Sequence, residues 1–195
     1  MLPDSGANVF LSQGWCVNKI KGDHLHVSAY PLFQPSTAPG VLAALAQART
    51  TGMSISLDLA SSAPLESHRG IVHEACKYAD VVFTNEEEAR ALLASPSHES
   101  RQVLHNRVSQ LARITVVKQG PQGAVAISGD LRIAAPAPQV HVVDTTGAGD
   151  ALAAGFLATW LKNGDLNAAL ESGVRIATEV VGRVGAGPYA DVTRD

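Results

Sequence analysis

The sequence predicts an α/β fold: a doubly wound, mainly parallel sheet with helices on both faces. Two observations carry this prediction. Segments rich in β-branched residues alternate along the chain with longer segments of helical periodicity, which is the pattern of βαβ units. The 195-residue chain is 46% hydrophobic and 17% charged, so it has enough apolar side chains to bury one core. We therefore expect a single domain over residues 1–195.

The first half of the chain alternates predicted strands and helices. Short apolar or alternating segments predict strands at 24–30, 53–60 and 80–83. Longer segments with apolar residues three or four positions apart predict helices at 38–50, 64–79, 86–94 and 99–113. In the first of these helices, Val41, Leu42, Leu45 and Ala48 share one helical stripe. This order is the one expected of successive βαβ units.

The second half begins with two strands in 114–128, joined at a Gly-Pro-Gln-Gly turn. A further strand is predicted at 140–144, "VHVVD", and an apolar helix follows at 151–161. The last helix is predicted from an apolar stripe formed by Leu166, Leu170, Val174, Ala177, Val181 and Val184. Ligands bind beyond the carboxyl ends of such strands, so one cleft should be lined by the loops after Asp58, Phe83, Lys118 and Val143.

Composition excludes several function classes. The net charge is −3 and no basic stripe is visible, so nucleic acid is not an expected partner. The longest apolar run, 151–161, is too short to span a bilayer, so no membrane association is expected. Cys16 and Cys76 lie far apart and outside any metal-binding spacing, which indicates a reduced, cytoplasmic protein. His24 and His26 share a strand face and are expected to be solvated or hydrogen-bonded, not metal-bound.

The segment "DTTGAGD", residues 144–150, places two glycines and an acid where a helix begins. The first turn of a helix has unpaired N–H groups and partial positive charge, and glycines let a ligand approach the backbone. These features predict an anion site, with Asp150 placed to accept a proton from a hydroxyl group. The alternative is a tight turn at Gly147 and Gly149, with Asp150 complementing the helix dipole. A dinucleotide-binding G-x-G-x-x-G motif is excluded by Leu152.

The longer stretch "VVDTTGAGDALAAGFLA" resembles the C-terminal signature of the ribokinase-like (PfkB) carbohydrate kinases. The resemblance implies that Asp150 is the catalytic base. It also implies that the backbone of Gly147, Ala148 and Gly149 forms the anion hole. Asp144 corresponds to an aspartate that helps to hold a monovalent cation, K⁺, in several members. Leu152 stands where the family commonly has phenylalanine, which is a packing substitution.

A second motif, "ADVVFTNEEEARALL" at 79–93, resembles the strand and N-x-x-E segment of the same family. Asn85 and Glu88 match its two fixed positions, and the resemblance implies that they organise hydrated Mg²⁺ and the nucleotide phosphates. The alternative is a capping box, in which Asn85 is the N-cap and Glu88 the N3 residue of a helix. Both roles can coexist in one pair of residues.

The nucleotide edge of the site is implied by two further segments. In "ITVVKQGPQGAVAI", Lys118 and Gly120 fall where the family contacts phosphate or ribose, although a lysine at a strand end can also be merely solvated. The segment 181–192 resembles the loop that closes over the adenine and cation sites, and it contains Gly185 and Gly187. Its alternative reading is a helix C-cap followed by a turn. Asp58 is expected either to face the phosphates or to cap the next segment.

The resemblance covers nearly the whole chain but only about the last two-thirds of a family member. These 195 residues show no counterpart of the first strands, the Gly-Gly substrate motif, the acidic residue that binds sugar hydroxyls, or the β-lid that often dimerises. We therefore expect one incomplete ribokinase-like domain, and a homodimer only in a longer parent protein.

The expected activity is ATP-dependent phosphorylation of a hydroxyl of a sugar or a nucleoside-like small molecule, with Mg²⁺ and K⁺ as further cofactors. The 195-residue chain by itself is expected to transfer phosphate weakly or not at all, because its acceptor contacts are missing. The alternatives are a noncatalytic nucleotide-binding module, that is, a truncated pseudokinase, and a fragment that does not fold alone.

Overall fold

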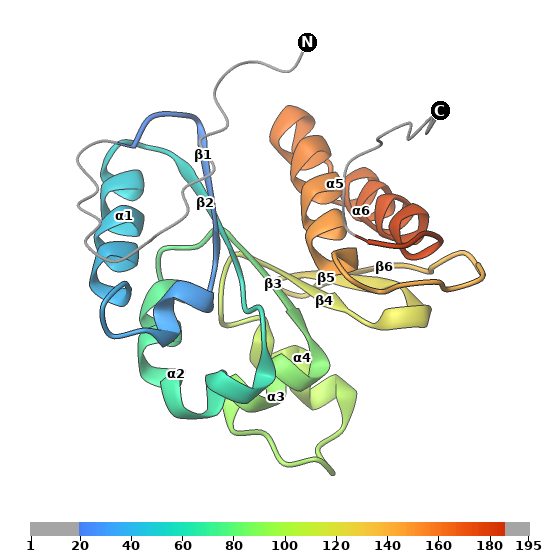
Figure 1. The fold of residues 1–195 in the computed structure, drawn as a ribbon, viewed down its shortest axis with the longest axis horizontal. Helices are drawn as coiled ribbons and strands as arrows, with labels where there is room; N and C mark the ends of the chain where they lie inside the picture. The colour runs from blue at the N-terminus through green and yellow to red at the C-terminus, as the bar shows by residue number, and fades with distance from the viewer. Residues whose placement is uncertain (1–19, 186–195) are drawn as a thin grey trace, which may run out of the picture. The chain divides into compact units, whose positions relative to one another are not determined.

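The structure is a computed structural model that describes residues 20–185 (Figure 1). The chain divides into two compact units. The first comprises the residues up to Val117 together with Ile127–Leu131. The second comprises Lys118–Ala126 and the residues from Arg132 onward. In the part of the chain that is described, no helix is long and apolar enough to cross a membrane.

Six strands form one sheet in which neighbours in the chain are also neighbours in space. They are β1 (His24–Ser28), β2 (Ser54–Asp58), β3 (Val81–Asn85), β4 (Ile114–Lys118), β5 (Ala124–Ser128) and β6 (Leu131–Ala135). Strands β1, β2 and β3 pair in parallel, and the last residues of β1 and β2, Ser28 and Asp58, are in register with Phe83 of β3. The links from β4 to β5 and from β5 to β6 are too short for a parallel crossover, so these strands form hairpins. The mostly parallel sheet agrees with the predicted fold class.

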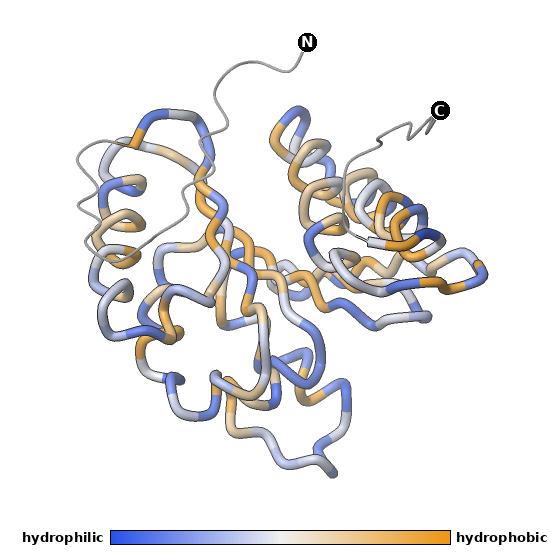
Figure 2. Tube along the Cα trace, viewed as in Figure 1, coloured by the Kyte–Doolittle hydropathy of each residue, from blue (hydrophilic) through white to orange (hydrophobic). Residues whose placement is uncertain are grey.

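The first unit contains the four predicted helices, with changes at their ends, and one short 3₁₀-helix that the sequence did not predict. They are η1 (a 3₁₀-helix, Tyr30–Phe33), α1 (Ala38–Thr50), α2 (Ser62–Cys76), α3 (Glu86–Leu93) and α4 (Arg101–Val108). Helix α4 is shorter than the predicted 99–113, because turns follow Val108. Strand β1 stops before Tyr30, where Pro31 starts the 3₁₀-helix. Hydrophobic residues run through the strands, while hydrophilic residues concentrate in turns and loops (Figure 2).

The carboxyl end of β2 leads directly into α2 through a tight turn. Asp58 is only 6% exposed. Its Oδ1 accepts a hydrogen bond from the Ala60 N–H at 2.8 Å. Ala60 has φ +66°, a left-handed conformation that costs a non-glycine residue roughly 1–2 kcal/mol. The bond from Asp58 helps to hold this strained turn, in agreement with the capping alternative for that residue.

The second unit contains η2 (a 3₁₀-helix, Gly120–Gln122) and two long helices, α5 (Ala148–Asn163) and α6 (Leu166–Val181). The two helices approach closely where glycines face each other. A Cβ on Gly173 would lie 2.7 Å from the Leu152 carbonyl oxygen, and a Cβ on Gly155 would lie 2.9 Å from the Ser172 carbonyl oxygen. Contacts this short are not found for real Cβ atoms, so the helix pair requires glycine at both positions.

The strand predicted at 140–144 is wrong. The third strand of this region is β6, at Leu131–Ala135, and residues 136–144 have no regular secondary structure. Pro136 and Pro138 follow β6 and lack the N–H groups that a strand would need. The predicted cleft required a strand before the loop that follows Val143, and the structure has none there.

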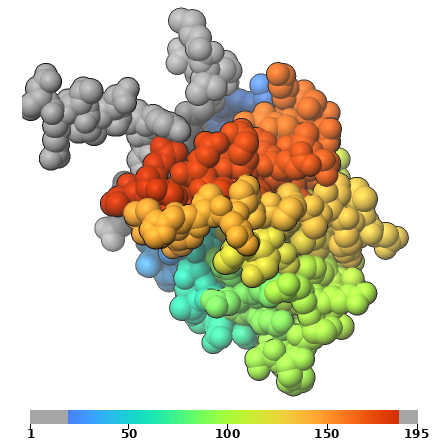
Figure 3. Space-filling model, turned by 90° about the vertical axis from the view of Figure 1, so that its right-hand side faces the viewer, coloured from blue at the N-terminus to red at the C-terminus, as the bar shows by residue number. Residues whose placement is uncertain are grey.

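The segment 136–147 is instead tied to the end of α6. The N–H groups of Val143 and Asp144 both donate to the Val181 carbonyl, at 2.8 and 3.3 Å. Figure 3 shows this segment, in yellow-orange, lying along α6, in red. The predicted stripe on α6 also extends too far, because the helix ends at Val181, three residues before the exposed Val184.

Candidate active site

The first turn of α5 is open. Its N-cap is Gly147, whose φ of +78° is left-handed, and no side chain caps the helix. The Ala148 N–H is used in a turn, donating to the Thr145 carbonyl at 3.2 Å. Within residues 20–185, no protein acceptor is found for the N–H groups of Gly149 and Asp150. Unsatisfied N–H groups carry the positive end of the helix dipole, so this turn presents an anion-binding surface.

Asp150 is the third residue of α5 and is exposed. Within the described chain its carboxylate forms no hydrogen bond or ion pair, and it does not fold back to cap its own helix. An accessible carboxylate beside an anion site can accept a proton from a hydroxyl group that attacks the bound anion. The arrangement therefore supports the chemistry predicted for Asp150.

The turn before α5 is fixed by Asp144. Its Oδ1 accepts from the Thr146 N–H at 2.9 Å, and its Oδ2 accepts from the Gly185 N–H at 3.0 Å. These bonds favour the ionised carboxylate: the Thr146 amide and side chain, followed by the Gly185 amide, lower the pKa of Asp144. Gly185 thus lies beside the turn, held through Asp144.

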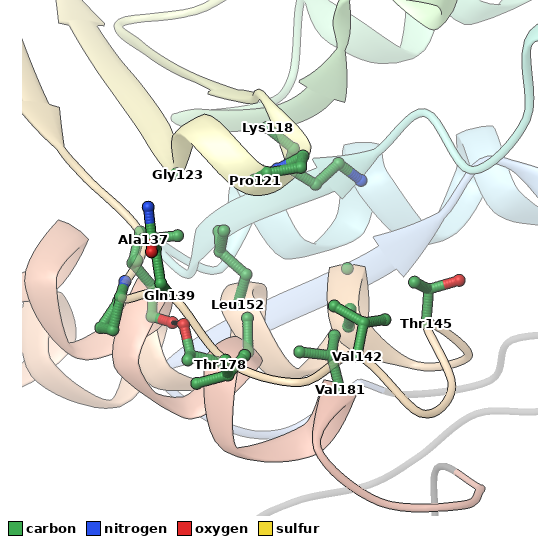
Figure 4. A pocket seen from close by; sticks show the side chains of 17 residues that line it. Lys118, Pro121, Gly123, Ala137, Gln139, Val142, Thr145, Leu152, Thr178 and Val181 are labelled. Atoms are coloured by element: carbon green, nitrogen blue, oxygen red, sulfur yellow. Dashed lines mark hydrogen bonds between the residues drawn. The ribbon is translucent and has the colours of Figure 1, made fainter.

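A pocket of about 470 Å³ adjoins the open turn and is built entirely within the second unit (Figure 4). It is lined by η2, the segment after β6, the start of α5 and the last turns of α6. The polar side chains in the lining are Lys118, Gln139, Thr145 and Thr178, and the remaining lining residues are glycine or apolar. A mostly apolar pocket of this size with a few polar groups is typical of a small-molecule site.

The Lys118 side chain places a positive charge at the end of this pocket that adjoins the first turn of α5. A Cβ on Gly149 would lie 3.4 Å from the Lys118 Nζ, so the ammonium lies beside the first turn of α5. Figure 4 shows the Lys118 side chain extending along the pocket toward the side where Thr145 lies. The ammonium and the N–H groups of the turn attract the same anion.

Four residues singled out from the sequence line this pocket together: Lys118, Gly120, Ala148 and Gly149. Leu152 lines it as well, so its difference from the family's usual phenylalanine alters the pocket wall. The sequence reasoning missed the wall formed by residues 137–145, because it treated part of that segment as a strand. It assigned Val174, Ala177 and Val181 to a core-facing stripe, but these residues also line the pocket.

The pair Asn85 and Glu88 lies in the first unit, where it forms a complete capping box on α3. The Glu88 N–H donates to Asn85 Oδ1 at 2.8 Å, and the Asn85 N–H donates to Glu88 Oε2 at 2.8 Å. Glu88 is 4% exposed. The capping alternative is therefore present in the structure. Gly187 lies outside the described residues.

Comparison with known proteins places this chain in a family. The family model described as "pfkB family carbohydrate kinase" matches residues 17–192. The chain belongs to the pfkB family. The ribokinase-like fold predicted from the sequence is thereby confirmed.

Relatives of this pfkB chain include an ATP-dependent ribose-1-phosphate kinase from Halopiger xanaduensis, which is 35% identical over 172 residues, covering 87% of this chain and 52% of that protein. A cytidine kinase from Thermococcus kodakarensis is 31% identical, covering 60% of this chain and 42% of that protein. The crystal structure of adenosine kinase from Sinorhizobium meliloti superposes with a TM-score of 0.80 at 26% identity, covering 86% of this chain and 51% of that one.

The pfkB chain spans about half the length of the curated relatives it matches, less than the two-thirds expected from its sequence. These relatives are named as kinases that act on sugar phosphates or nucleosides. They lend no support to the alternative of a noncatalytic module.

His24 and His26 of the pfkB chain are hydrogen-bonded, as predicted. His24 Nδ1 lies 2.7 Å from Ser54 Oγ, while His24 Nε2 and His26 Nδ1 lie 2.8 and 2.7 Å from Ser56 Oγ. Burial, aided by the nearby His26 and opposed by Asp80, lowers the pKa of His24 to about 4. Within residues 20–185, no group of three or more His, Cys, Asp or Glu side chains could hold a metal ion.

Proposed function

We propose that this chain is the nucleotide-binding and catalytic part of an ATP-dependent kinase that phosphorylates a hydroxyl of a sugar or nucleoside-like molecule. One observation carries the proposal. The open first turn of α5 and the Lys118 ammonium meet at one end of an apolar pocket, with the exposed Asp150 in that same turn. This combination suits a ligand with a flat apolar part and an anionic tail, which describes a nucleoside triphosphate.

The pocket divides the nucleotide into two parts. Its apolar walls, including Leu152, Val174 and Val181, suit the base, because burying a flat ring there removes apolar surface from water. Its polar end, at Gly149 and Lys118, suits the phosphates. All of these pocket residues belong to the second unit.

The transfer step follows from the groups at the polar end. Asp150 takes the proton of the acceptor hydroxyl, and the resulting oxygen attacks the γ-phosphorus as the bond to the leaving ADP breaks. The N–H groups of Gly149 and Asp150 donate to the oxygens of the transferred group, on which charge accumulates. Gly147 allows the turn and Ala148 completes it, so the backbone of residues 147–149, together with the Asp150 N–H, acts as the anion hole.

The metal requirements are part of the same proposal. Mg²⁺ keeps most of its water and enters with the nucleotide phosphates, so one amide and one carboxylate that contact its waters are sufficient. Asn85 and Glu88 offer that pair, although each uses one oxygen in the capping box of α3. For K⁺ we assign Asp144, whose ionised carboxylate borders the turn. Mg²⁺ neutralises phosphate charge when it is bound.

Location and assembly complete the proposal. We place the kinase in the cytoplasm, where ATP is available and thiols stay reduced. The buried Cys76 is a free thiol whose pKa burial raises to about 12, so it is unreactive. A homodimer is proposed only for a longer parent protein.

The test compares the wild-type chain with Asp150→Asn. Nucleotide affinity is measured by calorimetry. Phosphoryl transfer is measured by ADP release and labelled product, with ribose 1-phosphate, cytidine, adenosine and deoxyribose as acceptors. We expect Asp150→Asn to lower any turnover by about 10²–10⁴-fold, because the general base is lost. The ATP affinity should stay within about threefold, because the anion-binding N–H groups remain.

The matched control is Asp130→Asn, which changes an exposed aspartate in the hairpin turn between β5 and β6. It should leave both affinity and turnover unchanged. The proposal is wrong if the folded wild-type chain does not bind ATP, or if Asp150→Asn keeps its turnover.

A further inference from the structure

Asp144 connects two parts of the site that come from different ends of the second unit. Its Oδ1 accepts from Thr146 in the turn before α5, and its Oδ2 accepts from Gly185 in the segment after α6. Gly185 lies 41 residues further along the chain than Asp144. One carboxylate thus links the anion-binding turn to the C-terminal end of α6.

The backbone around Asp144 strengthens this connection. The N–H groups of Val143 and Asp144 both donate to the carbonyl of Val181, the last residue of α6. The carbonyls in the last turn of a helix lack partners within the helix, so this contact satisfies one of them. Val181 also lines the pocket, as do Val142 and Thr145 on either side of the bonded residues.

The bond to Thr146 controls the conformation of the turn. It closes a local ring from the Asp144 side chain to the backbone two residues on, which restricts the path of residues 144–146. Gly147 follows immediately with φ +78°, and the open N–H groups come next in the chain. The direction of these N–H groups therefore depends on the Asp144 carboxylate.

From these contacts we propose that Asp144 is a positioning residue that couples the α6 wall of the nucleotide pocket to the phosphate-binding turn of α5. The inference rests on the proposed function and adds a role for Asp144 beyond holding a cation. Removing the carboxylate leaves the base-binding walls in place but releases the turn. The loss should therefore affect a triphosphate more than a monophosphate, which reaches less of the turn.

Electrostatics gives the opposite expectation and so sharpens the test. Asp144 is a negative charge near a site for anions, and removing it alone should strengthen the binding of ATP. Positioning predicts weaker binding despite that gain. The sign of the change therefore separates the two effects.

The experiment measures the dissociation constants of ATP and AMP by calorimetry for the wild-type chain, Asp144→Ala and Asp144→Asn. We expect Asp144→Ala to weaken the binding of ATP about tenfold or more and the binding of AMP by less than about threefold. The loss for ATP is the size expected when hydrogen bonds to a charged group are lost. Asp144→Asn should lie between, because its amide oxygen can still accept from Thr146 while its NH₂ group cannot accept from Gly185.

Asp165→Ala is the matched control. Asp165 is the N-cap of α6 in the same unit, and its carboxylate likewise accepts two backbone N–H groups, from Asn167 and Ala168. It lies at the opposite end of α6 from Val181. We expect this variant to lower the melting temperature without changing the ratio of ATP to AMP affinity. If Asp144 had only a structural role, Asp144→Ala would leave that ratio unchanged as well.

Measurements in KCl and in choline chloride at equal ionic strength separate positioning from cation binding. Positioning predicts the same ATP defect in both salts, whereas a defect that disappears without K⁺ overturns the inference. Equal weakening of ATP and AMP, or tighter ATP binding by Asp144→Ala, overturns it as well. If the wild-type chain binds ATP and Asp144→Ala binds it equally well, this inference alone fails. If the wild-type chain binds neither nucleotide, the proposed function fails.

Discussion

Helices α3 and α5 carry the same kind of residue at the same helical position but use it differently. Each has an acid at its third position, Glu88 in α3 and Asp150 in α5. Glu88 is buried and accepts from the N–H of its own N-cap, Asn85. Asp150 is exposed, and its N-cap is a glycine with no side chain to offer. One helix satisfies its first turn with protein atoms, and in the described part of the chain the other leaves the N–H groups of Gly149 and Asp150 without a protein acceptor.

This difference has a cost in helix stability. A capped helix gains about 1 kcal/mol relative to an uncapped one. Helix α5 forgoes that gain, and it is instead held by close packing on α6 through Gly155 and Gly173. A pfkB chain can therefore keep an open turn because the rest of the helix is fixed by tertiary contacts.

The largest expected effect concerns the packing that holds the open helix. Gly173→Ala should destabilise the chain by about 3 kcal/mol, because its Cβ would lie 2.7 Å from the Leu152 carbonyl and force α5 and α6 apart. It should also weaken the binding of ATP, since Leu152 lines the pocket. Urea denaturation and calorimetry measure the two effects.

The control for that prediction is Gly70→Ala in α2, where an added Cβ meets nothing within 4 Å. This change should stabilise the chain by about 0.5–1 kcal/mol through lower chain entropy and better helix propensity. Equal effects of the two substitutions would show that α5 is not held by its contact with α6.

A smaller effect tests the comparison directly through the two acids. Glu88→Ala should cost about 2 kcal/mol, because it leaves the half-buried N–H of Asn85 without its acceptor. Asp150→Ala should change the unfolding free energy by less than about 0.5 kcal/mol, because its carboxylate is exposed and caps nothing. Urea titration at pH 7 gives both values. A large loss of stability for Asp150→Ala would show that this acid has a structural role after all.

The smallest effect is a pH dependence that arises in the first unit. Burial lowers the pKa of His24 from its ordinary value of 6.5 to about 4 in the folded chain, so the unfolded chain binds more protons between these two values. The unfolding free energy should therefore be constant above about pH 7, fall by about 1 kcal/mol between pH 6.5 and 4, and level off below. His24→Gln should reduce this slope, and an unchanged slope would assign the dependence to another group.

Local sequence signals predicted most elements of the first unit, because its strands and helices are short and their ends are marked by local residue patterns such as the capping box. The "TNEEE" segment predicted the start of α3 and its capping box, since a cap depends only on residues three positions apart. The prediction failed at 140–144, where apolar residues alternate with polar ones as in a strand. There the backbone bonds to the end of α6, a partner about 40 residues away that no local pattern indicates.

By itself the sequence determined which groups are available: a glycine turn before a helix, an acid at its third position, and a lysine at the end of a strand. These follow from residue type and spacing, which fix local backbone preference and charge. Only the tertiary structure decided that the Lys118 ammonium lies beside Gly149, that residues 137–145 form a pocket wall, and that Asp144 bonds to Gly185. Such contacts join residues far apart in the chain, and packing of the whole unit selects them.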